Sequence, residues 1–133
     1  DITHAMLTLV LGHIKAARAQ AVAVVEVRGA YEIPFMTDRL LKRKDIDAVI
    51  TLGCVLTGGT RHDETIAFAV SHQLLERSIS HGKPVSLGVM GPGITLKQAR
   101  ERIAGYAWGA TEAVLTQLDS IHGRTPKFSE EGH

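Results

Sequence analysis

The sequence contains a single cysteine, Cys54, among its 133 residues. One cysteine forms no internal disulfide and no Cys/His ligand spacing accompanies it, so a disulfide scaffold and a zinc finger are both excluded. An excess of charge of one sign is also missing, because 15 Lys and Arg face 14 Asp and Glu, for a formal net charge of +1. This balance argues against nucleic acid or an anionic membrane as the partner.

Long apolar runs and targeting signals are lacking as well. No apolar run approaches the roughly 18–20 residues that span a bilayer, so we expect no membrane-spanning helix. Residues 1–6 carry neither the basic region nor the small-residue cleavage site of a secretory signal. Together with the lone cysteine, these absences predict a cytoplasmic protein. The length predicts one domain, over 1–119, and the polar remainder, 120–133, predicts a loose tail.

Helical and strand patterns alternate along the chain. Apolar spacing and end signals such as Pro34 and Gly82 predict helices over 1–20, 33–44, 60–81 and 95–119. Runs of β-branched and apolar residues predict buried strands over 21–27, 48–56 and 85–90, the last ended by the turn 91–93. Such an alternation predicts the α/β class, with a parallel sheet between two layers of helices.

Ligands bind at the carboxyl ends of the strands in sheets of this kind, which selects the loops 28–33, 57–63 and 90–94. In the second loop, Gly58-Gly59-Thr60 follows a buried strand and opens a helix, so its backbone N–H groups can bind a phosphate or a carboxylate. The same residues are equally compatible with a plain capping box made by Thr60 and Asp63. The spacing alone leaves both interpretations open.

Four side chains near these loops have chemistry that suits a site. His62 can transfer protons near neutral pH, although a loop histidine is also an ordinary surface residue. Glu32 can accept hydrogen bonds from ligand hydroxyls or simply begin a helix. Arg102 can clamp a phosphate or belong to a solvated helix face. Cys54 lies among apolar strand residues, which favours a buried small side chain over a nucleophile.

Four stretches, in this order and at this spacing, resemble the lumazine synthase family. They are Arg28-Gly29-Ala30-Tyr31-Glu32-Ile33-Pro34, Asp47 through Val55, Gly58-Gly59-Thr60-Arg61-His62-Asp63, and Gln98-Ala99-Arg100-Glu101-Arg102. The turn 91–93, Gly-Pro-Gly, is more similar to the archaeal branch than to the bacterial one. The resemblance implies a three-layer α/β/α sandwich with a parallel, flavodoxin-like sheet.

The reaction that the resemblance implies is the condensation of 5-amino-6-(D-ribitylamino)uracil with 3,4-dihydroxy-2-butanone 4-phosphate. The products are 6,7-dimethyl-8-ribityllumazine, phosphate and water, in the penultimate step of riboflavin biosynthesis, and no cofactor or metal is implied. By position, His62 would transfer protons, while Gly59, Thr60 and Arg102 would bind the phosphate. The residues implied for the ribityl chain and the pyrimidine are Ala30, Tyr31, Glu32, Cys54, Val55, Leu56 and Leu87.

The sequence also departs from the family pattern. Family members begin with a strand and a stacking aromatic residue, and this sequence starts just after that point, so we expect the first strand to be missing from the chain. Leu87 stands where bacterial members have an aromatic residue, Thr57 where many have Arg, and Tyr106 where Lys is common.

Assembly is a further expectation from the resemblance. Family members form pentamers, some of them built into icosahedral sixty-subunit capsids, with each active site shared between neighbouring subunits. Two alternatives remain: an archaeal-type riboflavin synthase, which dismutates the lumazine product with a divalent metal, and a non-catalytic, shell-forming scaffold of the same fold.

Overall fold

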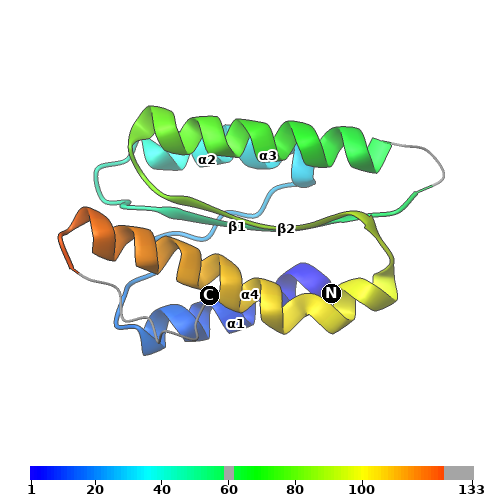
Figure 1. Ribbon diagram of the computed structural model, residues 1–133, viewed down its shortest axis with the longest axis horizontal. Helices are drawn as coiled ribbons and strands as arrows, with labels where there is room; N and C mark the ends of the chain where they lie inside the picture. The colour runs from blue at the N-terminus through cyan, green and yellow to red at the C-terminus, as the bar shows by residue number, and fades with distance from the viewer. Residues whose placement is uncertain (59–61, 125–133) are drawn as a thin grey trace.

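The computed structural model describes residues 1–58 and 62–124, in which helices surround a parallel pair of strands. The elements are α1 (Ile2–Ala16), the 3-10 turn η1 (Ala30–Glu32), α2 (Ile33–Leu41), β1 (Val49–Leu56), α3 (His62–His81), β2 (Val85–Ile94) and α4 (Leu96–Ile121). Helices α2 and α3 lie on one face of the strands, and α1 and α4 on the other (Figure 1). The α/β class and the three layers are therefore confirmed.

Local signals in the sequence set the ends of the helices. The Asp1 carboxylate accepts a hydrogen bond from a backbone N–H of the first turn of α1, and Pro34 lies in the first turn of α2. Gly82 follows α3 with a φ of +65°, a conformation that favours glycine. At α4 the side chains of Thr95 and Gln98 form a capping box with each other's backbone N–H groups.

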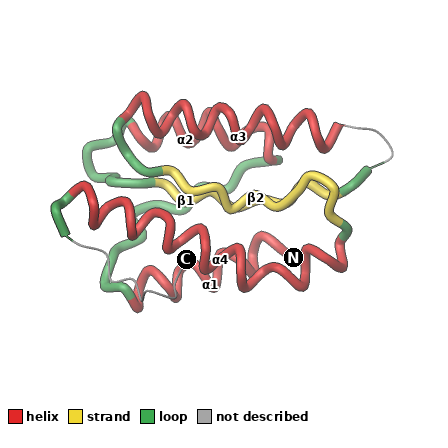
Figure 2. Tube along the Cα trace, viewed as in Figure 1, coloured by secondary structure: helices red, strands yellow, loops and turns green. Residues whose placement is uncertain are grey.

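The strand expected over 21–27 is wrong. These residues form an extended connection with no strand assigned, between α1 and η1 (Figure 2). Val22, Val24 and Val25 are exposed, so the segment is not enclosed by other described residues. The β-branched composition suits a sheet, but a strand exists only where a neighbour accepts its backbone hydrogen bonds, and no such neighbour lies within the described ranges.

The expected end of the last strand at Met90 is also wrong. β2 continues through the turn 91–93 because pairing with β1 resumes after an irregularity, with Leu56 opposite Ile94. Gly91 has a φ of +101°, and a Cβ on it would collide with the backbone carbonyl oxygen of Val55. The glycine thus lets the bulged end of β2 lie directly against the end of β1.

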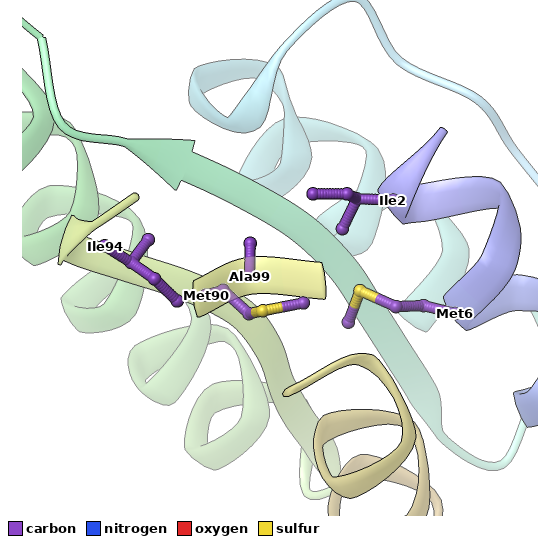
Figure 3. Close-up of a cluster of buried hydrophobic side chains, with 5 residues drawn as sticks. All are labelled: Ile2, Met6, Met90, Ile94 and Ala99. Atoms are coloured by element: carbon purple, nitrogen blue, oxygen red, sulfur yellow. The ribbon is translucent and has the colours of Figure 1, made fainter. Parts of the chain in front are cut away.

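Two apolar clusters, one on each face of the strands, hold the layers together. The first joins α1 and α4 to β2, and Figure 3 shows its five side chains converging: Ile2, Met6, Met90, Ile94 and Ala99. The second, toward α2 and α3, consists of Ile33, Val55, Val70, Leu74 and Val89. Neighbouring residues of β2, Val89 and Met90, belong to opposite clusters, as the alternation of side chains along a strand requires.

At the carboxyl end of the chain, α4 continues to Ile121, two residues beyond its expected end. The greater part of the expected tail, 125–133, lies outside the described residues. Across the described ranges, none of the helices combines the length and the apolar character needed to cross a membrane.

Candidate active site

The carboxyl end of β1 presents side chains to both layers of helices. Val55 is buried on the side of α2 and α3, where the half-buried Ala30 packs against the same cluster. Cys54 and Leu56 face the other way and line a pocket with Leu96 at the start of α4. Burial raises the pKa of the Cys54 thiol, which favours its neutral form. The sequence predicts a buried side chain here, whereas Cys54 is half-buried and lines the pocket.

The turn before α2 brings the next group of expected residues to the same region. Ala30, Tyr31 and Glu32 form η1, in which the Glu32 N–H donates to the carbonyl of Gly29 at 3.1 Å. Tyr31 is 71% exposed and Glu32 is also exposed, while η1 itself packs against α3. A flat aromatic ring and a carboxylate therefore stand at the surface near the strand end, where a polyhydroxylated ligand can reach them.

The loop after β1 leads directly into α3, and His62 is the first residue of that helix. Its side chain is exposed, which leaves the imidazole accessible to a small molecule. The start of the loop is fixed by the Thr57 N–H, which donates to the carbonyl of Ile94 at 2.9 Å. Gly59 and Thr60, the expected phosphate-binding residues, lie outside the described residues.

Leu87 and Arg102 lie together in a different part of the chain's surface, between β2 and α4. Both line an open groove between β2 and α4, of about 540 Å³, along with Tyr106 and the small residues Gly105 and Gly109. Leu87 is 47% exposed and the Arg102 side chain is exposed as well. The groove therefore offers an apolar surface beside a guanidinium, and the carboxylate of Glu101 belongs to the same lining.

The expected site residues thus form two groups within one chain. His62 and η1 belong to the layer of α2 and α3, whereas Arg102 belongs to the opposite layer (Figure 1). Leu87 pairs with Thr51, five positions before Leu56, which places it about 16 Å down the strand from the end of β1. Within one chain, Leu87 and the end of β1 are therefore too far apart for a single pyrimidine ring to contact both.

Comparison with known proteins gives the family. The sequence profile of 6,7-dimethyl-8-ribityllumazine synthase matches residues 1–122. This chain belongs to the 6,7-dimethyl-8-ribityllumazine synthase family. Proteins of that name from Staphylothermus marinus and Metallosphaera sedula are 44% identical over 119 residues and 47% identical over 115. These alignments cover 90% and 86% of this chain, and 79% and 76% of the relatives.

A third lumazine synthase relative, from Sulfolobus acidocaldarius, is 42% identical over 121 residues, which are 91% of this chain and 77% of the relative. All three organisms are archaea, so the expected archaeal branch of the lumazine synthase family is confirmed. The matched region includes both groups of expected site residues.

One contact in this chain was not predicted from the sequence. The carboxylate of Asp63, expected only to cap α3, accepts a hydrogen bond from the backbone N–H of Gly93 at 3.3 Å. No pattern in the sequence links two residues thirty positions apart, and only the fold reveals the bond. Among the described residues, no group of three or more His, Cys, Asp or Glu side chains is arranged to hold a metal ion.

Proposed function

We propose that this chain is a lumazine synthase, a transferase that condenses 5-amino-6-(D-ribitylamino)uracil with 3,4-dihydroxy-2-butanone 4-phosphate. The products are 6,7-dimethyl-8-ribityllumazine, phosphate and water, in riboflavin biosynthesis. The observation that carries the proposal is the family match over residues 1–122, a range that includes the strand ends, the loop before α3 and the groove beside α4. The single cysteine is consistent with a cytoplasmic location.

His62 is the proposed proton-transfer residue. Imine formation, phosphate loss and ring closure each require a proton to move, and an imidazole can accept and return one near neutral pH without a metal or cofactor. Its exposed position at the start of α3, beside the end of β1, suits this role. The larger part of the rate enhancement comes from holding the amine against the ketone, which is worth up to about 7–11 kcal/mol in ideal cases.

The remaining expected residues divide into a pyrimidine-side group and a phosphate-side group. Ala30, Tyr31, Glu32 and the end of β1 at Cys54, Val55 and Leu56 are proposed to bind the ribityl chain and the ring. Gly59 and Thr60 are proposed to bind the phosphate with their backbone and hydroxyl groups, and Arg102 to clamp it, with Leu87 packing on the ring.

Because Leu87 lies about 16 Å along the strands from the end of β1 in the same chain, and Arg102 lines the same groove as Leu87, we propose that each site combines two subunits. The groove of one copy would then cover the strand ends of its neighbour, in a pentamer or a sixty-subunit capsid. Exposed apolar residues along α3 support self-association: Phe68, Leu75 and Ile79 are 65%, 63% and 74% exposed and recur at helical spacing.

A two-substrate assay with His62→Ala and Arg102→Ala tests both parts of the proposal. We expect His62→Ala to slow turnover by about 10–100-fold. Arg102→Ala should raise the KM for the phosphate substrate and leave the KM for the pyrimidine unchanged, because the guanidinium is assigned to the phosphate. Absence of product from the unaltered chain would contradict the proposed reaction, and riboflavin formed from the lumazine alone would identify a riboflavin synthase instead.

Co-expression of the two variants tests the shared site. If His62 and Arg102 act from different subunits, about one quarter of the sites in random mixed assemblies regain both residues, since each half is intact with a probability of one half. At a low concentration of the phosphate substrate the mixture should then exceed either variant alone. A mixture no more active than its components would show that both residues act from one chain.

A further inference from the structure

A cluster of charged side chains joins the second half of α2 to the last turns of α3, which lies beside it (Figure 1). The Asp38 carboxylate of α2 accepts hydrogen bonds from His81 Nε2 at 2.8 Å and from Arg77 Nη1 at 3.2 Å, both at its Oδ1 atom. Its Oδ2 atom lies 3.1 Å from Nζ of Lys42 in the same helix. The Oδ1 atom therefore makes the contacts between the helices, and the Oδ2 atom makes a contact within α2.

The contact between the helices is partly enclosed. The side chains of Asp38 and His81 are 20% and 18% exposed, against 59% for Lys42. Arg77 Nε is buried and has no hydrogen-bond partner among the described residues, so the place of this guanidinium beside Asp38 costs an unsatisfied N–H. Hydrogen bonds are directional, whereas apolar contacts permit two helices to slide past each other. The bonds to Asp38 therefore fix how far α2 lies along α3.

The start of α2 is attached in a different way from its end. Ile33, the first residue, is 8% exposed and belongs to an apolar cluster with Val70 and Leu74 of α3. In the part of the chain that the structure describes, no side chain caps η1 or the start of α2 with a hydrogen bond. At the end of α2, Nζ of Lys83 donates to the carbonyl of Leu41 at 2.9 Å and so reinforces the bonds to Asp38. Polar contacts at its end thus set the lengthwise position of the whole helix.

A shift of α2 along its axis reaches η1 directly. The turn η1 ends where α2 begins, and the Ile33 N–H donates to the carbonyl of Ala30. Glu32 lies six residues before Asp38, which is about 9 Å along a helix that rises 1.5 Å per residue. The side chains of Tyr31 and Glu32 are exposed, so the backbone of η1 places them rather than packing of their own.

We infer that Asp38 is a positioning residue for the pyrimidine. By fixing α2 against α3, its carboxylate sets where η1 presents Tyr31 and Glu32 to the ribityl chain and the ring. This inference rests on the proposed function. It assigns the role to the bonds that cross from α2 to α3 and not to the ion pair with Lys42.

Three variants separate the bonds between the helices from the ion pair within α2. His81→Ala removes one bond to α3, and Asp38→Ala removes every contact of the carboxylate. Lys42→Ala is the matched control, because it removes a contact of Asp38 that does not reach α3. Each purified variant is compared with the unaltered chain by steady-state kinetics with both substrates and by hydrogen–deuterium exchange of the peptide covering 28–36, well below its unfolding temperature.

Asp38→Ala should raise the KM for 5-amino-6-(D-ribitylamino)uracil by about tenfold, the worth of one hydrogen bond to Glu32, and His81→Ala by about threefold. The KM for the phosphate substrate should stay unchanged, because the residues assigned to the phosphate lie outside η1 and α2. Lys42→Ala should match the unaltered chain in both KM values. A defect of stability alone lowers the fraction of active enzyme, and thus kcat, and leaves both KM values as they were.

Hydrogen exchange at 28–36 should accelerate in Asp38→Ala and His81→Ala but not in Lys42→Ala. An unchanged KM for the pyrimidine in Asp38→Ala, an equal rise in Lys42→Ala, or a parallel rise in the KM for the phosphate substrate would overturn the inference. Where Asp38→Ala does not fold, the comparison of His81→Ala with Lys42→Ala decides by the same criteria.

Failure of the proposed function has a different signature. An unaltered chain that forms no product from the two substrates contradicts the reaction. Exchange at 28–36 then decides the structural part of the inference by itself. Faster exchange in His81→Ala than in Lys42→Ala supports the placement of η1 through α2, and equal exchange in the two variants overturns it.

Discussion

Replacement of Asp38 by asparagine tests how the layer of α2 and α3 is held together. The Asp38 carboxylate accepts a hydrogen bond from His81 Nε2 at 2.8 Å and lies 3.2 Å from Arg77 and 3.1 Å from Lys42 Nζ. Only 20% of the Asp38 side chain is exposed. The hydrogen bond from His81, followed by that from Lys42, holds the pKa of Asp38 well below its usual range.

At pH 7 we expect Asp38→Asn to lower the free energy of unfolding by about 1.5–3 kcal/mol, the range for a hydrogen bond to a charged group. The sign of the pH dependence follows from the lowered pKa. A carboxyl that is more acidic when folded stabilises the protein above its unfolded pKa, here 3.8, and loses that contribution as the pH falls toward its folded pKa. The difference in stability between the two proteins should therefore begin to shrink below about pH 4 and close only as the pH approaches the folded pKa.

Urea denaturation followed by the fluorescence of Trp108, at one protein concentration and at several pH values, measures this difference. Asp45→Asn is the matched control: Asp45 also pairs with an arginine, Arg43, at 2.7 Å, but 53% of its side chain is exposed. We expect Asp45→Asn to lower the free energy of unfolding only slightly, since solvent screens exposed ion pairs. Equal losses in the two variants, or a deficit of Asp38→Asn that persists unchanged at low pH, would refute the reasoning.

Two further substitutions test packing. Gly88→Ala should lower the free energy of unfolding by about 1–3 kcal/mol in urea denaturation, because its Cβ collides with the carbonyl oxygen of Thr51. The control is Gly12→Ala on α1, where a Cβ meets nothing within 4 Å, and it should not lower the free energy of unfolding. His13→Ala removes the edge-to-face contact with Trp108, whose ring centroid lies 4.9 Å from that of His13. It should shift the fluorescence emission of Trp108 and lower the free energy of unfolding by about 0.5–1 kcal/mol. An unchanged emission spectrum would contradict that contact in solution.

Most of the fold was predictable because its helices carry their own end signals. Pro34 and Gly82 mark the start of α2 and the end of α3 in the sequence itself. The two errors in the strands have a common cause, since a strand depends on its neighbour. The segment 21–27 has the composition of a strand and lacks a partner among the described residues, whereas the turn 91–93 resembles a strand end and yet pairs again beyond it.

The candidate site was predictable in its residues and not in their arrangement. The rule that ligands bind at the strand ends selected His62 because it follows β1 in the chain. It selected η1 from the strand expected over 21–27, which is not formed, and only the fold brings η1 against β1. Chain order does not specify which face of the strands each helix covers. The sequence therefore did not show that Arg102 and His62 lie on opposite faces of the strands. Before the fold was known, only the family resemblance supported a site made by two subunits.

The extended connection over 21–27 has a practical consequence for handling the protein. It is an exposed window of β-branched and small apolar residues with no proline, of the kind that pairs edge to edge with identical segments in other molecules. Glu26 is the one charged side chain in it, and charges of this sort act as gatekeepers against fibril formation. Within this window, Glu26 is therefore the side chain that opposes edge-to-edge pairing between copies of the isolated chain.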